Sequence, residues 1–329
     1  MQTALKQHLN IIHMKTFHPS ASPQTEAPVS IFERPLWRTV LALLSAIAWG
    51  WAFPLVKIGF VELGITADMT ASKMVYAGVR FALAGLLVLA IAALLRRRFT
   101  LRSSGDVWFV VLFALVNTAL HYAFFYLGMS HSAGARAAIL NSMSAFILVL
   151  AACIFFKSDR LTRYKVIGCA MGITGIFMLH AGGSSSGGGF SLLGDGMIML
   201  NALCAACGGL MTRLLSKRVD IFVGTGYSLA LGGAMLLGYG ILCGGTIPQV
   251  TLLGCVALAS LVGISTFGFM TYNKLLSCNP VGKVAIFNSL IPIVGALTSC
   301  WCLGETFYPN YIVAAALATA GIYLVNRGK

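Results

Sequence analysis

Acidic residues are scarce in this chain of 329 residues. It holds 9 Asp and Glu against 23 Lys and Arg, and charged residues of both signs make up only 10% of the chain. No Asp or Glu falls deep inside an apolar stretch, because Asp106, Asp195 and Glu305 all lie near the ends of such stretches. This scarcity disfavours proton coupling through a buried carboxylate pair. It also disfavours binding of cationic compounds, which need an opposite charge once they leave water.

Motifs of catalysis and of nucleotide hydrolysis are missing as well. The sequence has no Walker motif, no paired-aspartate motif and no histidine pair at metal-ligand spacing. Cys204 and Cys207 form a C-x-x-C, but neither a second pair nor a nearby histidine accompanies them. We therefore interpret the nine cysteines as small apolar packing residues and expect no metal and no cofactor. A membrane-embedded lipid-modifying enzyme is a remote alternative only.

Long apolar stretches dominate what is present. Hydrophobic residues make up 58% of the chain, and the mean hydropathy is +0.86. The stretches are about 20 residues long, which is the length of a helix that crosses a bilayer. They are continuous rather than alternating, so helices are predicted in preference to a barrel. Ten spans are expected, beginning near Leu36, Met74, Asp106, Ser132, Tyr164, Leu193, Ile221, Thr251, Val281 and Tyr308.

The chain repeats itself. Residues 138–143 read AILNSM and residues 285–290 read AIFNSL, 147 positions later (285 minus 138). A basic residue precedes each copy, Arg136 in the first and Lys283 in the second. Five spans per copy is an odd number, so the second copy must enter the membrane in the opposite sense. The predicted fold is an all-α integral membrane protein with ten transmembrane helices as two inverted five-helix repeats.

The net charge of +14 reflects orientation rather than nucleic-acid binding. If the N-terminus is cytoplasmic, the cytoplasmic segments hold every basic residue except Lys57, Lys73, Arg80 and Arg136. This bias follows the positive-inside rule and predicts both termini in the cytoplasm, with the chain in the plasma (bacterial inner) membrane. The expected domains are a disordered tail over 1–35, one repeat over 36–181, an external Gly/Ser linker over 182–192 and the second repeat over 193–329.

Four short motifs carry a family resemblance. They are Trp49-Gly50, Arg80-Phe81, Ile291-Pro292-Ile293 and Leu303-Gly304-Glu305. In this order they resemble the drug/metabolite transporter superfamily, EamA type, over residues 40 to 326. The resemblance implies a carrier whose site lies between spans one to four and six to nine. The first repeat departs from the pattern, because Ala145 stands where the family usually has proline, and we expect the fourth span to be straighter than the ninth.

Arg80 is the sharpest candidate for substrate binding. A lone cation near the middle of a span costs at least about 2.5–3.5 kcal/mol on insertion scales, so it should face a cavity or a partner. Ser228 occupies the equivalent position of the second repeat, 148 residues later (228 minus 80), although a slip of one residue would make it Tyr227. Because the charge is not repeated, it favours substrate discrimination. Snorkelling towards the headgroups, or a structural bond to a carbonyl, is the competing interpretation.

Other polar or aromatic residues within the spans are further candidates for the site. Amides inside a membrane must be hydrogen-bonded, so they either line a site or pin one helix to its neighbour. A histidine there either carries a proton or is a hydrogen-bonded core residue, and aromatic residues either line a cavity or pack. The candidates beside Arg80 and Ser228 are Trp49, Tyr76, Asn117, His121, Tyr122, Asn141, Asn201 and Asn288.

Basic residues at span ends are candidate gates. Lys57 and Arg213 end the first and sixth spans, and Arg136 and Lys283 begin the fourth and ninth. Snorkelling anchors and simple helix-start positions are the alternatives. Pro54 and Pro292 are expected to act as hinges, because proline interrupts helical hydrogen bonding.

The residues together predict a secondary transporter. We expect alternating access and export of a small amphipathic metabolite that is amino-acid-like or bears a carboxylate. The alternative is a broad-specificity drug exporter, and a channel is disfavoured because inverted halves and an absence of charged rings do not suit one. The expected partners are the small-molecule substrate and the lipid bilayer, with no nucleic acid, and the chain is expected to be a monomer or a weak homodimer.

Overall fold

A computed structural model describes residues 30–155, 161–180, 190–279, 284 and 286–327. Phe32–Lys329 forms one compact unit. Residues 1–29 of the predicted tail, the Gly/Ser segment of the linker and Lys283 fall outside the described residues, whereas residues 30–35 of that tail are described.

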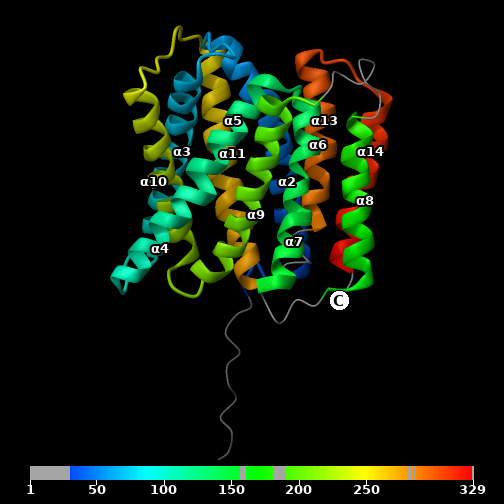
Figure 1. The fold of residues 1–329 in the computed structure, drawn as a ribbon. Coiled ribbons are helices and arrows are strands. Elements are labelled where there is room, and N and C mark those ends of the chain that lie inside the picture. Colours follow the sequence, from blue (N-terminus) through cyan, green and yellow to red (C-terminus); the bar gives the residue numbers. More distant parts are fainter. Residues whose placement is uncertain (1–29, 156–160, 181–189, 280–283, 285, 328–329) are drawn as a thin grey trace, which may run out of the picture. The chain divides into compact units, whose positions relative to one another are not determined.

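Every regular element among the described residues is a helix. The α-helices are α2 (Pro35–Glu62), α3 (Thr70–Leu94), α4 (Ser104–Ala114), α5 (His121–His131), α6 (Gly134–Asn141), α7 (Met143–Phe155), α8 (Arg163–His180), α9 (Met197–Leu215), α10 (Ile221–Leu242), α11 (Leu252–Cys278), α13 (Leu290–Leu303) and α14 (Pro309–Arg327) (Figure 1). Two π-helical segments, η1 (Leu115–Leu120) and η3 (Leu192–Gly196), and one 3-10 segment, η4 (Ile286–Ser289), join them.

Seven helical segments in the described part of the chain are long and apolar enough to cross a membrane. They are Pro35–Glu62, Thr70–Leu94, Ser104–His131, Gly134–Phe155, Leu192–Leu215, Ile221–Leu242 and Leu252–Cys278. Two shorter apolar helices, Phe287–Leu303 and Pro309–Val325, follow. The predicted class, an all-helical multi-pass membrane protein, is therefore confirmed. The predicted number of ten crossings is not reached by length and composition alone.

Side-chain caps set where several helices begin. The Ser103 hydroxyl accepts a hydrogen bond from the backbone of Asp106 at the start of α4, and the Thr251 hydroxyl accepts one from Gly254 at the start of α11. Asp220 caps α10 in the same way. Such caps satisfy backbone N–H groups that have no partner inside the helix. These loops therefore end where a short polar residue precedes an apolar run.

Glycines allow α3 and α10 to touch along their backbones. A methyl group on Gly85 would lie 2.2 Å from the backbone nitrogen of Ala230, and one on Gly233 would lie 2.2 Å from that of Ala82. The pairs run in opposite directions along the two helices, so α3 and α10 are antiparallel. Each pair also becomes the other when residues 148 apart are exchanged (85 to 233, 230 to 82). The contacts therefore have the pattern of a two-fold relation between the two halves.

The other helix contacts repeat this pattern. α8 packs along α14, at one side of the bundle in Figure 1. α2 packs on α11 as α9 packs on α5, and α2 packs on α13 as α9 packs on α7. α2 and α9 are the first helices of the two repeats. If the repeats are exchanged, the α2–α11 contact takes the place of the α9–α5 contact, and the α2–α13 contact takes the place of the α9–α7 contact.

The fourth and ninth spans are both interrupted at the repeated Asn-Ser. α6 ends at Asn141 and α7 begins after Ser142, while η4 gives way to α13 after Ser289. Ser142 (φ −60°, ψ −19°) and Ser289 (φ −61°, ψ −19°) have the same backbone conformation. Pro292 explains the second break, since it has no N–H for the helical bond. The first break occurs without a proline, at Ser142. That the fourth span is straighter than the ninth stays a prediction.

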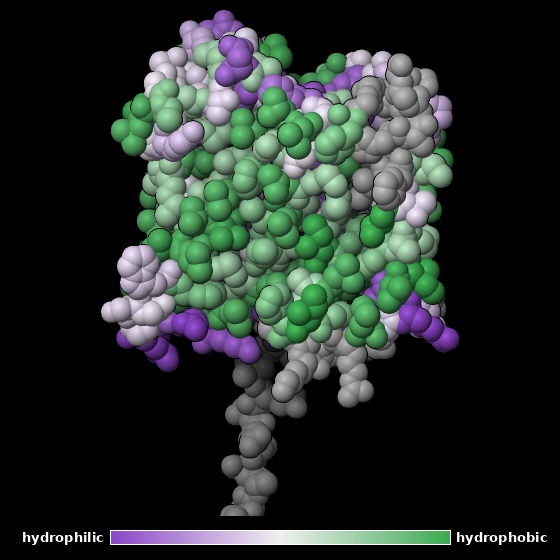
Figure 2. Space-filling model, in the orientation of Figure 1, coloured by the Kyte–Doolittle hydropathy of each residue, from purple (hydrophilic) through white to green (hydrophobic). Residues whose placement is uncertain are grey.

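The surface fits a lipid environment. Figure 2 shows hydrophobic residues over the middle of the visible face and hydrophilic residues gathered along its upper and lower edges. Large apolar side chains such as Leu86, Leu112 and Val256 are exposed rather than buried. Exposed apolar surface on this scale is unfavourable in water and is typical of contact with hydrocarbon.

Candidate functional site

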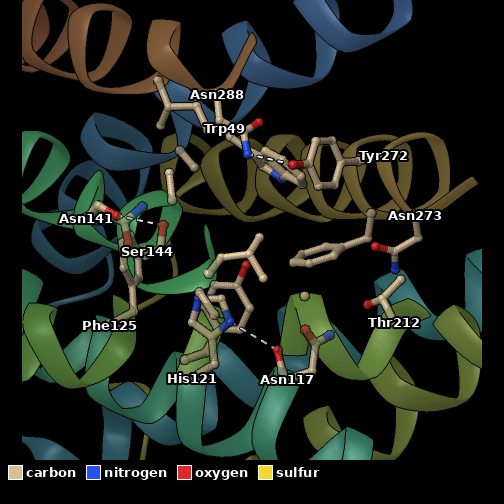
Figure 3. A pocket seen from close by; sticks show the side chains of 18 of the residues that line it. Trp49, Asn117, His121, Phe125, Asn141, Ser144, Thr212, Tyr272, Asn273 and Asn288 are labelled. Carbon is tan, nitrogen blue, oxygen red and sulfur yellow. Dashed lines mark hydrogen bonds between the residues drawn. The ribbon is translucent and has the colours of Figure 1, made fainter. Parts of the chain in front are cut away.

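A cavity of about 150 Å³ lies between helices of both repeats (Figure 3). A cavity of this size holds a molecule as large as benzene. Its wall combines aromatic side chains with amides, hydroxyls and a guanidinium. The lining residues are Trp49, Ala52, Phe53, Arg80, Asn117, His121, Tyr122, Phe125, Asn141, Ser144, Ala145, Leu148, Ala205, Gly209, Thr212, Phe269, Tyr272, Asn273, Leu276, Asn288 and Ile291.

Equivalent positions of the two repeats carry side chains of different size on the cavity wall. Lys57 on α2 and Arg213 in the last turn of α9 are equivalent by sequence, 156 residues apart (213 minus 57), although α2 continues to Glu62. With the same offset, Trp49 on α2 corresponds to Ala205 on α9, and Phe53 on α2 corresponds to Gly209 on α9, and all four line the cavity. The wall thus carries large aromatic side chains on α2 where the equivalent positions of α9 are Ala and Gly.

Arg80 reaches this cavity from α3 and is held by neutral groups. Its side chain is 1% exposed. The Nε–H donates to the Ser265 hydroxyl of α11 at 2.9 Å, and Nη1 donates to the Tyr126 hydroxyl of α5 at 3.0 Å. The guanidinium carbon lies 4.7 Å from the centre of the Phe81 ring and 5.7 Å from that of Tyr122. Hydroxyls and ring faces orient a cation but leave its charge uncompensated.

No carboxylate lines the cavity among the described residues. Arg80 is accordingly the only formally charged side chain in the described part of its wall. A buried cation in a medium of low dielectric strongly favours an anion within a few ångströms. The arrangement can therefore bind a carboxylate or another small anionic group directly.

Amides surround the same space. Asn201 on α9 donates from Nδ2 to Oδ1 of Asn141 at 2.6 Å, which joins the two repeats at the break between α6 and α7. Asn288, at the equivalent break in the second repeat, donates to the Tyr272 hydroxyl at 2.7 Å (Figure 3). Each helix break thus turns an amide towards the cavity. Asn273 on α11 adds another, tied to a neighbouring threonine hydroxyl on α10 at 3.0 Å.

The π-helical segment η1 places Asn117 and His121 on the cavity wall. The Asn117 carbonyl lies 3.1 Å from Nδ1 of His121, so this ring nitrogen is engaged with the backbone (Figure 3). The His121 ring stacks on Tyr122 with centroids 4.3 Å apart. π-Helical turns free backbone groups and occur frequently at functional sites. The sequence did not predict this turn, because its residues read as ordinary helix.

The structure does not bring three of the predicted site residues to the cavity wall. Tyr76 packs between Phe60 and Tyr126 in the core, with centroids 6.0 Å and 5.8 Å away. Ser228 is buried at the contact between α10 and η1, where its hydroxyl lies 3.1 Å from that of Thr118. Asn201 sits behind Asn141. Tyr76 and Asn201 each lie one turn from a lining residue on the same helix, Arg80 and Ala205, so their position along the helix and the side chains that cover them keep them off the wall. The sequence does not show this covering.

Several lining residues were not predicted. Thr212, Tyr272 and Asn273 line the cavity from α9 and α11, and Ser144 from the start of α7. The adjacent polar pair Tyr272-Asn273 inside an otherwise apolar span was an available signal. Ser265, which holds Arg80, carried no signal, because small hydroxyl residues are common in membrane helices.

At one end of the bundle, charged groups link helices of the two repeats. In the upper part of Figure 1, where α6 begins and α13 ends, Glu305 follows the C-terminus of α13. Its carboxylate accepts hydrogen bonds from the backbone N–H groups of Gly134 at 2.7 Å and Ala135 at 3.0 Å. Lys57, five residues before the end of α2, lies 3.2 Å from the same carboxylate. The prediction that Lys57 ends the first span is therefore corrected. Glu305 of the second repeat thus holds two helices of the first.

Arg136 and Asp195 form a second link at the same end. The guanidinium donates to both carboxylate oxygens, Nε to Oδ1 at 2.9 Å and Nη2 to Oδ2 at 2.7 Å. Both side chains are buried, and they belong to different repeats. The cavity lies away from this end, since Thr212 and Leu276 reach it from the last turns of α9 and α11.

The remaining candidates for gates and hinges fall at helix ends or within helices. Arg213 lies in the last turn of α9, and Lys283 is outside the described residues. Pro54 is buried inside α2, which continues through it, and Pro292 lies in the first turn of α13. These positions do not test a gating or hinge role.

A multi-pass helical bundle with a polar cavity between two related halves is typical of membrane transporters. The sequence profile of the EamA-like transporter family matches residues 36–181 and again residues 192–327. The chain belongs to the EamA-like transporter family, and the two matches account for its internal repeat.

Proteins of similar sequence include named transporters. The chain is 30% identical to a WAT1-related chloroplastic protein of Arabidopsis thaliana over 74% of its length, and it spans 60% of that longer relative. It is 25% identical to a probable amino-acid metabolite efflux pump of Salmonella typhimurium over 86% of this chain and 93% of the other. One crystal structure superposes with a TM-score of 0.63 at 16% identity, covering 86% of this chain and 95% of that one, and it supports the fold alone.

Proposed function

We propose that this protein is a secondary transporter that exports a small metabolite bearing a carboxylate, of the amino-acid type. The observation that carries the proposal is Arg80, a buried cation on the cavity wall whose hydrogen-bond partners are neutral hydroxyls. A carboxylate bound there would supply the missing charge and match the planar guanidinium. The amides of Asn141, Asn273 and Asn288 would bind the remaining polar groups, and the aromatic side chains would cover an apolar part.

The proposed architecture has ten crossings in two inverted five-helix repeats. It is supported by the exchange-related contacts of α3 with α10 and by the double match to the family profile. With the basic loops on the cytoplasmic side, both termini are cytoplasmic and the protein lies in the plasma membrane. We propose that it acts there as a monomer or a weak homodimer.

Access to the site would alternate between the two faces. With this orientation, the end held by Glu305 and by the Arg136–Asp195 pair is external, so the cavity is closed to the outside. Release of these links and closure of the other end would expose the site to the outside. The two halves would rock against each other around the glycine contact of α3 with α10.

Flux measurements in liposomes test this proposal. The purified protein is reconstituted alone, and uptake of a panel of amino acids, their carboxylate analogues and organic cations is followed. Arg80→Ala should weaken the apparent affinity for carboxylate substrates by about 10- to 150-fold, the value of one charge-assisted hydrogen bond. Arg80→Lys should recover part of it, because the charge remains and the fork geometry is lost.

Matched controls keep this test sharp. Ser228→Ala alters the equivalent position of the second repeat, outside the cavity wall, and should leave the apparent affinity near that of the original protein. Equal transport of carboxylates by Arg80→Ala and the original protein would contradict the proposal. Transport of organic cations that is independent of Arg80 would instead favour the drug-exporter alternative.

A further inference from the structure

A second hollow, of about 330 Å³, lies between the loop that joins α3 to α4 and the loop that joins α9 to α10. Five arginines line it, Arg96, Arg97, Arg98, Arg102 and Arg218, against one carboxylate, Asp220. One loop comes from each repeat, so the arginines converge only in the folded protein. The transport cavity does not share any of these residues.

Two carboxylates contact these loops in the described part of the chain, Asp220 and Asp106, against five arginines. Asp220 is engaged as the cap of α10, where it accepts the N–H groups of Phe222 at 2.9 Å and Val223 at 3.4 Å. Asp106 lies 3.6 Å from Arg218 and can offset one arginine. Arg97 is held over the Phe222 ring at 5.0 Å. The hollow is therefore a positively charged pocket with several guanidinium groups, the geometry that binds phosphate oxygens.

The backbone of Arg96 shows that the pocket is more than a by-product of the fold. Arg96 has φ +52° and is the only non-glycine residue with positive φ in the described part of the chain. It ends α3 in a Schellman turn, in which Arg96 N–H bonds to Ala93 and Arg97 N–H bonds to Ala92. Glycine is the usual residue at this position, because a Cβ is strained there.

The second repeat has the expected glycine at the equivalent position. Gly244 lies 148 residues after Arg96 (244 minus 96) and ends α10 in the same turn with φ +76°. Its N–H bonds to Ile241, and that of Gly245 bonds to Gly240. The fold is thus satisfied by glycine, and the first repeat keeps a strained arginine at the pocket instead. Strain of this kind points to a role other than folding.

Lipid-facing surface adjoins the pocket. Leu94, at the end of α3, is 82% exposed, and Trp108 on α4 is 73% exposed. Hydrophilic residues along the lower edge in Figure 2 lie directly below the hydrophobic band. An amphiphile could therefore place its charged group among the arginines and its acyl chains against α3 and α4.

We propose that this pocket binds the phosphate of an anionic phospholipid headgroup in the leaflet that faces it. The arginines bind the phosphate oxygens, and Arg96 is retained in a strained conformation because it contributes to that binding. Each basic residue near an anionic lipid surface contributes the equivalent of about a fivefold change in affinity. The lipid would hold together two loops that belong to different repeats.

Thermal unfolding of the full chain in a neutral detergent tests the proposal. The probes are dioctanoyl phosphatidylglycerol, dioctanoyl phosphatidylcholine and inorganic phosphate, each titrated over the same concentrations. A ligand that binds only the folded protein raises the unfolding midpoint. We expect phosphatidylglycerol to raise it and the other two probes to leave it unchanged.

Three variants separate binding from folding. Arg96→Gly should raise the midpoint without lipid, because it relieves strain, and should weaken phosphatidylglycerol binding about fivefold. Arg98→Gln with Arg102→Gln should weaken binding about 25-fold. Gly244→Arg is the matched control, since it places the same strained residue at the other end of the bundle; it should lower the midpoint and leave lipid binding unchanged.

Two results would overturn the proposal. If Arg96→Gly and the Arg98, Arg102 double variant respond to phosphatidylglycerol like the original protein, the pocket does not bind the lipid. If inorganic phosphate raises the midpoint as strongly as phosphatidylglycerol, the site takes free phosphate rather than a lipid. Neither result depends on transport, so the pocket and the proposed transport function are tested separately.

Discussion

Charged side chains have different partners in two regions of the molecule, the end of the bundle where α6 begins and the cavity. At the end where α6 begins, Arg136 forms a two-point ion pair with Asp195, and Lys57 forms an ion pair with Glu305. In the cavity, Arg80 is equally buried but meets only hydroxyls and rings. Opposite charges that belong to different repeats hold those repeats together. A charge with neutral partners is left to interact with whatever enters. The difference fits the proposed roles, with ion pairs that close one end and a cation that recognises the substrate in the cavity.

Breaking the ion pair between Arg136 and Asp195 should have the largest effect, a loss of folding free energy. Arg136→Ala leaves the Asp195 carboxylate buried without its cation, which costs about 3–5 kcal/mol of folding free energy. Replacing both residues by leucine should recover most of this loss, because two apolar side chains leave no buried charge. Denaturant unfolding in detergent measures both. A double variant no more stable than Arg136→Ala would show that the pair is not the reason.

Removing the neutral partners of Arg80 should affect recognition more than folding. Tyr126→Phe with Ser265→Ala deletes both hydroxyls that orient the guanidinium and leaves the packing almost unchanged. We expect the apparent affinity for substrate to fall by about 10-fold or more, from one to two hydrogen bonds to a charged group. The maximal transport rate should change little. A fall in rate at constant apparent affinity would contradict a positioning role.

Weakening the bonds of Glu305 should raise the population of the conformation in which the end held by Glu305 is open. Glu305→Gln keeps an acceptor for the backbone of α6 and loses the charge that attracts Lys57. A difference of about 1 kcal/mol is expected between a charged and a neutral acceptor, which is roughly a fivefold change in population. A cysteine at Ser144 in the cavity, in a background free of native cysteines, should react faster with an impermeant reagent added outside. An unchanged labelling rate would remove Glu305 from the closure.

The smallest effect is expected at Lys57. Its side chain is 25% exposed, so water and salt screen its attraction to Glu305. Lys57→Met should cost no more than about 1 kcal/mol of stability, and this cost should shrink further at high salt. Unfolding midpoints at low and high ionic strength measure it. A loss as large as that of Arg136→Ala would mean that exposure does not separate the two links.

Much of the architecture could be predicted from the sequence. The length and continuity of the apolar stretches predicted membrane-spanning helices, because hydrocarbon permits few other backbones. Most predicted span starts agree with helix starts to within a few residues, for example Leu36 with Pro35 and Leu193 with Leu192. The recurrence of Asn-Ser predicted related halves, and the family motifs predicted the transporter class. These features are local or periodic, so they can be read along the chain.

The site itself was decided by tertiary structure. Arg80 could be singled out because a charge in an apolar span is conspicuous, but its partners Ser265 and Tyr126 come from two other helices. Tyr76 and Ser228 look equally suitable in sequence and face the core instead. Which residues share a cavity depends on the rotation of each helix about its axis, on the position of each residue along its helix and on where α6 and η4 break. Those angles are set by packing between residues far apart in the chain, such as Gly85 against Ala230, and no local pattern records them.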